Sequence, residues 1–147
     1  MEEREFLELF RRYLRSRGLY DTRARERIAA ALFRLPGHVD AAALGYRLRQ
    51  EGVPAAPATV YRTLELLVQA GLARKFVWDD RALYEAALGR PHHEHLLCTQ
   101  CGRIVEFHDA PLEERIAEVY EEQGFRPASH QVLLFGICPR CSAGSSQ

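Results

Sequence analysis

Apolar side chains recur every three or four residues through the first half of the chain, which is the spacing of amphipathic helices. Residues that suit helix ends bracket each stretch. Thr22, Asp40 and Pro57 stand at starts, and glycines stand at or just beyond the ends. The pattern predicts helices over residues 2–17, 22–35, 40–52 and 58–70.

The spacing then changes to short runs typical of strands. Leu72 to Trp78 and Ala82 to Ala87 predict two strands joined by a turn at Asp79-Asp80-Arg81. Several short helices followed by a small hairpin is the order of a winged helix-turn-helix, in which the helix before the hairpin reads DNA. A generic helical subdomain with a hairpin is the alternative.

Gly89-Arg90-Pro91 interrupts the pattern, and the residues that follow have a different hydrophobic pattern. Strands are predicted over 95–98, 103–107 and 130–137, with a helix over 111–122 and a frayed tail from Ser142 to Gln147. We therefore predict an α+β protein with a winged helix-turn-helix domain over residues 1–88 and a small α/β domain over 89–147. The hinge between them is placed around residues 86–92.

The composition is that of a folded soluble protein, since apolar residues make up 47% and charged residues 27% of the chain. The longest apolar runs, such as Ile28 to Phe33, are far too short to cross a membrane. The acidic start does not have the pattern of a secretory signal. We expect a cytoplasmic protein with no membrane partner.

A net charge of zero conceals an asymmetry along the chain. Residues 11–75 carry thirteen basic and five acidic residues, whereas the part from Tyr84 onward carries five basic and nine acidic ones. A basic front half suits a polyanion such as nucleic acid. Solvated helix faces would give the same count, so charge alone leaves both interpretations open.

All four cysteines stand in two identical spacings, Cys98-x2-Cys101 and Cys138-x2-Cys141. A two-residue spacer lets two thiolates converge on one ion, and two such knuckles form the closed tetrahedral shell of a structural zinc site. A closed shell leaves no position for a substrate, so this zinc would hold structure. Two disulfides or a redox dithiol are the alternatives, although reduced thiols are usual in the cytoplasm.

Three of the six histidines fall in His92-His93-Glu94-His95, just before the first knuckle. On an extended segment alternate residues point to opposite sides, which suits two metal sites. Imidazole and carboxylate ligands fit Fe(II), Mn(II), Zn(II) or Co(II), bound more reversibly than by thiolates. The candidate partners from elsewhere are His38, Glu85, Glu106, Glu113 and His130. A solvated polar loop is the alternative.

Four motifs together resemble the ferric uptake regulator family. Residues 58–64, Ala-Thr-Val-Tyr-Arg-Thr-Leu, resemble its recognition-helix motif, and residues 92–102 resemble its hallmark metal motif. Thr22 with Arg25 matches its Thr-x-x-Arg, and Cys138-Pro139-Arg140-Cys141 matches its closing knuckle. The resemblance runs from about Leu14 to Cys141.

The resemblance implies three metal sites and a DNA-binding surface. The structural zinc ligands would be Cys98, Cys101, Cys138 and Cys141. The regulatory ligands would be His38, Glu85, His93, His95 and Glu106. An additional site within the dimerisation domain would use His92, Glu94, Glu113 and His130. The expected DNA contacts are Tyr61, Arg62, Thr59, Arg25, Arg15 and Arg17.

The resemblance also implies a mechanism. His38 and Glu85 belong to one half and the other regulatory ligands to the second half, so one shared ion would fix their relative orientation. A homodimer would then present two recognition helices to double-stranded operator DNA. We expect a repressor with structural Zn²⁺ and with Fe²⁺, Mn²⁺ or Zn²⁺ as regulatory ion. Iron is favoured because no cysteine is left for zinc sensing and the carboxylates are glutamates; peroxide, zinc and manganese sensing are the alternatives.

Two other classes of function stay open from sequence alone. A metalloenzyme would need an open metal position and a positioned base, and no motif of that kind is present, so we expect no enzymatic activity and no small-molecule substrate. A zinc-stapled interaction module without DNA binding is the second. A metalloenzyme would also leave the basic helical half unexplained.

Overall fold

The computed structural model describes residues 1–87 and 92–144. The chain divides into two compact units, residues 1–90 and 91–147. The predicted boundary after residue 88 and the Gly89-Arg90-Pro91 hinge lie outside the described residues. No helix of the described parts is both long and apolar enough to cross a membrane.

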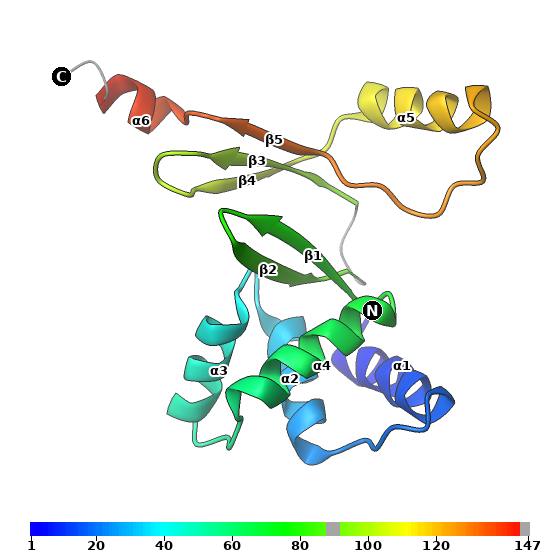
Figure 1. The fold of residues 1–147 in the computed structure, drawn as a ribbon, viewed down its shortest axis with the longest axis vertical. Coiled ribbons are helices and arrows are strands. Elements are labelled where there is room, and N and C mark those ends of the chain that lie inside the picture. Colours follow the sequence, from blue (N-terminus) through cyan, green and yellow to red (C-terminus); the bar gives the residue numbers. More distant parts are fainter. Residues whose placement is uncertain (88–91, 145–147) are drawn as a thin grey trace. The chain divides into compact units, whose positions relative to one another are not determined.

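The first unit contains four helices followed by a two-stranded hairpin (Figure 1). The elements are α1 (Glu3–Ser16), α2 (Arg23–Arg34), α3 (Ala41–Gln50), α4 (Pro57–Gln69), β1 (Ala73–Trp78) and β2 (Arg81–Ala86). Two helix starts are capped as predicted: the Thr22 hydroxyl accepts from the Arg25 N–H and the Asp40 carboxylate from the Ala43 N–H. Pro57 occupies the first turn of α4.

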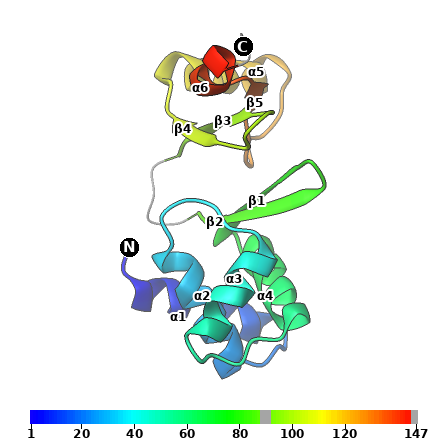
Figure 2. The ribbon, with the colours of Figure 1, turned by 90° about the vertical axis from the view of Figure 1, so that its left-hand side faces the viewer.

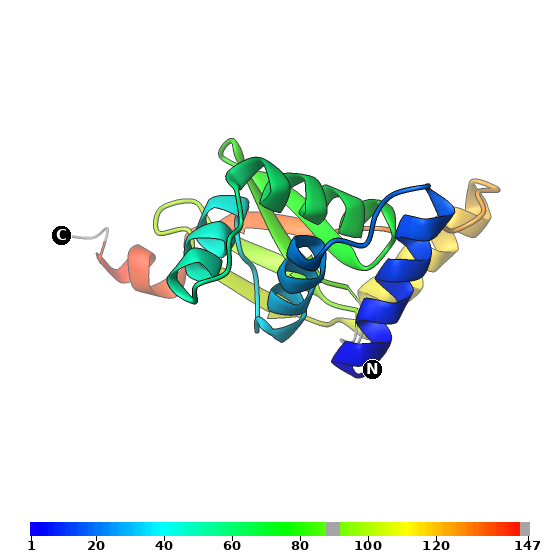
Figure 3. The same cartoon turned by 90° about the horizontal axis from the view of Figure 1, so that it is seen from below.

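One hydrophobic core joins these elements. Phe6, Phe10 and Leu14 from α1 are buried in the same cluster as apolar side chains of α2, α3 and α4, among which Ile28 and Leu64 are fully buried. Figures 2 and 3 show the four helices gathered into one cluster, and the hairpin contacts it through β1 against α4 and β2 against α2 and α3. The hairpin therefore fixes the orientation of α4 within this unit.

The hairpin turn is tighter than the predicted three residues. Asp79 and Asp80 alone form it, both with positive φ, and Arg81 already pairs with Trp78 in the antiparallel ladder. Two residues with positive φ match the right-handed twist of the flanking strands, and aspartate tolerates this conformation better than most residues do.

The second unit consists of β3 (Glu94–Cys98), β4 (Ile104–Phe107), α5 (Ala110–Glu122), β5 (Leu133–Gly136) and α6 (Pro139–Gly144). Its sheet has the order β4-β3-β5, with β3 antiparallel to β4 and parallel to β5. Helices α5 and α6 lie at opposite ends of this sheet (Figures 1 and 3).

Two predictions for the second unit were wrong in detail. β5 is shorter than the predicted strand over 130–137, because His130 lies outside the ladder and interacts with carboxylates instead. Residues 142–144, predicted to be frayed, belong to the six-residue helix α6, which begins at Pro139 and carries Cys141. So short a helix has no apolar period to reveal it.

Candidate metal centres and nucleic-acid interface

The four cysteines converge at one end of the second unit. Cys98 ends β3, and Cys138 follows β5, which pairs with β3 in parallel so that Cys98 lies opposite Gly136. The four Sγ atoms lie within 4.8 Å of one another, and Cys101 and Cys138 are separated by 3.8 Å. A tetrahedron with Zn–S bonds of about 2.3 Å has sulfur–sulfur edges of roughly 3.8 Å. The cluster thus fits a structural zinc site.

Hydrogen bonds favour the thiolate form of Cys98 and Cys138, whereas side-chain hydrogen bonds with Cys138 and Cys101 raise the pKa of Cys141 to about 12. The backbone N–H groups of Cys101 and Cys138 lower the pKa of Cys98 to about 6, and the Cys138 nitrogen lies 3.3 Å from the Cys98 Sγ. The N–H of Cys141 likewise lowers the pKa of Cys138. All four cysteines are free. Four thiols that converge on one point without an S–S bond among them are the arrangement of a metal site rather than of two disulfides.

A second cluster lies within the same unit and joins the start of β3 to α5. Its members are His92, Glu94, Glu113 and His130, whose candidate ligand atoms lie within 4.8 Å of one another. The His130 Nε2 lies 3.1 Å from both Glu94 and Glu113 carboxylate oxygens, and the His92 Nε2 lies 3.3 Å from Glu113. This hard N and O donor set is suited to a divalent first-row ion.

Glu94 is the anchor of this cluster. It is 1% exposed and accepts a 2.7 Å hydrogen bond from the Val132 N–H. Burial raises the pKa of Glu94, but hydrogen bonds from His92 and from the Val132 N–H outweigh that effect, so the pKa lies below its usual value. The backbone therefore holds the carboxylate in its ionised, ligating form.

Within residues 1–87, two candidate ligands lie together, His38 and Glu85. The His38 Nε2 lies 3.1 Å from a Glu85 carboxylate oxygen. His38 is on the loop before α3, and its neighbour Val39 forms a two-bond bridge with Tyr84, at 3.0 and 2.8 Å, beside Glu85 on β2. The rings of His38 and Phe76 also pack nearly perpendicular to each other, with centroids 5.0 Å apart. A residue far away in sequence is thereby held against the strand.

Three further candidate ligands share one face of the second unit's sheet. His95 on β3 lies opposite Glu106 on β4, and the His93 Nε2 lies 3.6 Å from the Glu106 carboxylate. The rings of His93 and His95 lie 5.0 Å apart. Alternation along the segment thus sends these two histidines to one side, whereas His92 and Glu94 contact each other on the other. His108, the remaining histidine, is exposed and belongs to neither cluster.

A polar network that the sequence analysis missed connects β2 to α4. The Tyr84 hydroxyl donates a 2.6 Å hydrogen bond to Glu65 on α4, and the Lys75 ammonium donates one of 2.7 Å to the same oxygen. Burial raises the pKa of Glu65, but the hydrogen bonds from Lys75 and Tyr84 have the larger effect, so the pKa lies below its usual value. Tyr84 and Glu85 are consecutive on a strand, so they face opposite sides. If Glu85 is a metal ligand, this alternation predicts that Tyr84 points away from the metal site.

Replacing Tyr84 with phenylalanine should destabilise the protein by about 1.5–3 kcal/mol, the usual worth of a hydrogen bond to a charged group. Tyr84 is completely buried, and phenylalanine keeps its ring packing, so the lost bond to Glu65 dominates. Urea unfolding measures the difference. Tyr20→Phe, at an exposed position, should stay within about 0.5 kcal/mol. Equal stability of the Tyr84 variant and wild type would contradict the assignment.

The recognition-helix candidate α4 exposes the predicted DNA-contacting side chains. Tyr61 is 51% exposed and Arg62 is exposed, while Val60 and Leu64 are fully buried in the core. An open pocket of about 150 Å³ lies between α2 and the start of α4; Arg25, Ala58, Thr59, Arg62 and Thr63 line it. Three of the six predicted contact residues therefore line one pocket.

Two of the basic candidates, Arg25 and Arg17, have partners within the unit. Arg25 donates a 2.6 Å hydrogen bond to the Tyr20 carbonyl, which ties the loop before α2 to that helix. Arg17 lies over the Tyr13 ring, 5.4 Å from its centroid, and Arg15 is exposed near the end of α1. These positions leave their contact with DNA as a prediction.

Comparison with known proteins decides the family. The model of the ferric uptake regulator family matches residues 16–135. The chain belongs to this family. A ferric uptake regulation protein from Campylobacter jejuni is 32% identical over 138 residues, covering 92% of this chain and 88% of its own.

Solved structures agree with this result. The Helicobacter pylori ferric uptake regulator, described as having three functional metal binding sites, matches with a TM-score of 0.83 and 27% identity over 97% of this chain and 95% of its own. The Pseudomonas aeruginosa ferric uptake regulator with manganese matches with a TM-score of 0.75 and 31% identity, covering 86% of this chain and 95% of its own. The predicted fold class is therefore confirmed, and the chain is a DNA-binding regulator of the metal-uptake type rather than an enzyme.

Proposed function

We propose that this protein is an iron-responsive repressor that binds operator DNA as a homodimer when its regulatory site holds a metal ion. One observation carries the proposal: each unit holds an incomplete set of hard ligands. The first contributes His38 and Glu85, and the second His93, His95 and Glu106. Neither set alone supplies the four protein ligands of a closed site, and the three-ligand set of the second unit would leave coordination positions open.

Residues of both units would share this ion. A bound divalent ion would attract imidazole and carboxylate ligands from both units, because neither unit alone supplies enough of them. Sharing would restrict the relative orientation of the units, so the recognition helices of a dimer would be ordered before they meet DNA. Because the metal ion would already have ordered the two units, DNA binding would no longer have to offset the entropy lost in ordering them.

The choice of iron rests on the ligands and on the relatives. Every cysteine belongs to the knuckles, so none is left for a thiolate-containing zinc sensor. Curated relatives are named ferric uptake regulation proteins. Manganese sensing is the second candidate, because a related regulator was solved with manganese. Sensing of zinc or of peroxide would use the same ligands, and first-row ions overlap in affinity for them.

The homodimer is supported by apolar side chains left on the second unit. Leu134, Phe135 and Ile137, on and just after β5, are 45%, 55% and 53% exposed. Consecutive residues of a strand face opposite sides, so both faces of β5 expose apolar side chains. Exposed apolar groups of this kind mark association surfaces. A second copy of the chain would cover them and place two winged helices at the spacing of two half-sites.

The metal is tested by anaerobic operator titrations of the zinc-loaded protein with Fe(II), Mn(II) or Zn(II). The probe is a duplex that the protein itself selects from a random library with Mn(II) present. We expect Fe(II) to raise the affinity at the lowest free concentration, and sedimentation to report a dimer. A response to Zn(II) alone would replace iron by zinc, and DNA binding indifferent to every metal would refute the proposal.

Arg62→Ala should weaken binding to the selected duplex by about 5–150-fold, which corresponds to roughly 1–3 kcal/mol for a side chain that reads a base edge. The residue is exposed on α4, so folding should be unaffected. Fluorescence anisotropy measures the change. Arg126→Ala, which removes the same charge from an exposed position of the second unit, is the control. If Arg62→Ala bound the duplex with wild-type affinity, α4 would not be the helix that reads the DNA sequence.

A further inference from the structure

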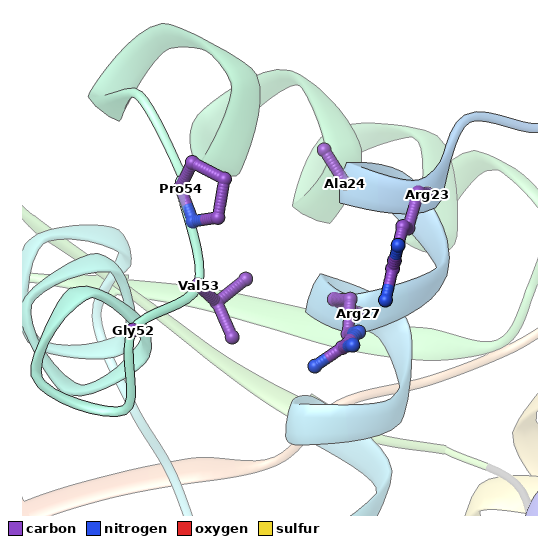
Figure 4. Close-up of a pocket in the computed structure, with 6 residues that line it drawn as sticks. All are labelled: Arg23, Ala24, Arg27, Gly52, Val53 and Pro54. Atoms are coloured by element: carbon purple, nitrogen blue, oxygen red, sulfur yellow. The ribbon is translucent and has the colours of Figure 1, made fainter.

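An open pocket of about 230 Å³ lies where α2 faces the turn between α3 and α4. Figure 4 shows its walls: Arg23, Ala24 and Arg27 from α2, and Gly52, Val53 and Pro54 from the turn. The two arginines are one helical turn apart, so both guanidinium groups reach the same side of the pocket. Nothing in the metal sites or in the predicted DNA contacts uses them.

The pocket carries positive charge without a compensating carboxylate. In the described parts of the chain, neither Arg23 nor Arg27 forms an ion pair. The acidic residues nearest in sequence are engaged elsewhere: Asp21 and Glu26 pair with Arg11 at 3.1 and 3.2 Å, and Glu51 pairs with Arg47 at 3.7 Å. Two adjacent cations with no internal partner favour an anion from outside.

The opposite wall is apolar. Val53 and Pro54 face Ala24 across the pocket, and the turn that carries them is fixed, because the Arg49 guanidinium donates a 2.8 Å hydrogen bond to the Ala55 carbonyl. The Gly52 and Val53 N–H groups already donate to carbonyls at the end of α3. An occupant would therefore meet guanidinium groups on one side and hydrocarbon on the other. A deoxyribose joined to a phosphate has this division of apolar and anionic parts.

The position of the pocket selects nucleic acid over a free anion. The turn at Gly52 to Pro54 leads directly into α4, and Arg25 on the same α2 lines the pocket at the start of α4. In a helix-turn-helix, elements beside the recognition helix lie along the DNA backbone. We infer that the Arg23–Arg27 pocket binds a sugar-phosphate segment of duplex DNA and supplies affinity without sequence discrimination. This inference rests on the proposed function.

Titration at several salt concentrations tests the inference. Each phosphate contact contributes about 0.9 to the slope of log affinity against log salt. Arg23→Ala/Arg27→Ala should bind roughly tenfold more weakly, with a slope shallower by about 0.9–1.8. The loss should be the same for the selected duplex and a scrambled duplex, because phosphates carry no sequence information. Arg23→Lys/Arg27→Lys keeps the charge, so it should keep a slope near that of wild type.

The outcomes separate the inference from the proposed function. A wild-type slope in the alanine double variant, or a loss confined to the selected duplex, overturns the phosphate assignment while metal-dependent binding by wild type stands. Failure of wild type to bind any duplex with metal overturns both. Circular dichroism of each variant checks folding, which we expect to be unchanged because both arginines are exposed.

Discussion

Cys98→Ser is expected to unfold much of the second unit and to lower the bound structural zinc by about one equivalent per chain. The four thiolates close the end of a small sheet in which β4 and β5 contribute only four residues each. No residue of α5 or β5 is buried, so the apolar core available to this unit is small. Zinc binding energy then serves as folding energy, as in other small metal-stapled domains.

Zinc analysis together with thermal unfolding measures this effect. The matched control is Gln100→Ala, which changes an exposed side chain inside the same knuckle and keeps its backbone N–H groups. It should retain both zinc and melting temperature. If the Cys98 variant also retained them, the four-cysteine cluster would not be a structural zinc site.

His38→Ala is expected to give a folded, zinc-loaded protein whose affinity for operator DNA no longer rises with added metal. His38 is the one histidine of the first 87 residues, so no other imidazole of that unit can replace it opposite Glu85. The ring lies on a loop, and its loss touches neither cysteine pair. Allosteric coupling of this kind is worth about 1–3 kcal/mol, or 5–150-fold in affinity, most of which should disappear.

The measurement is a duplex titration at fixed Mn(II) and without metal. His108→Ala is the control, since that histidine is exposed and lies in neither ligand cluster. It should keep the full gain. If added Mn(II) raised the DNA affinity of His38→Ala as much as that of wild type, the first unit would contribute no essential imidazole to the regulatory site.

Much of the fold was predictable because its signals are local. Helix starts at Thr22 and Asp40 follow from side chains that cap the backbone N–H three residues later. The four-cysteine cluster was equally accessible, since two identical short spacings allow few other geometries. Alternation in an extended segment also divided His93 and His95 from His92 and Glu94.

Features that depend on tertiary contacts were not predictable in the same way. The hydrogen bond from Tyr84 to Glu65 requires the hairpin to pack on α4, and the Arg23–Arg27 pocket requires α2 to face a turn some 25 residues away. Neither has a sequence spacing of its own. The limits of β5 also depended on where parallel pairing with β3 stops rather than on its apolar run.

The central claim is that one regulatory ion, shared by the His38 and His93 ligand sets, controls DNA affinity. Anaerobic anisotropy titration of the selected duplex with zinc-loaded wild-type protein, with and without Fe(II), tests it most directly. We predict an affinity about 5–150-fold higher with Fe(II), and by reciprocity the same factor of tighter Fe(II) binding when duplex is present. Identical affinities in the two titrations would contradict the account.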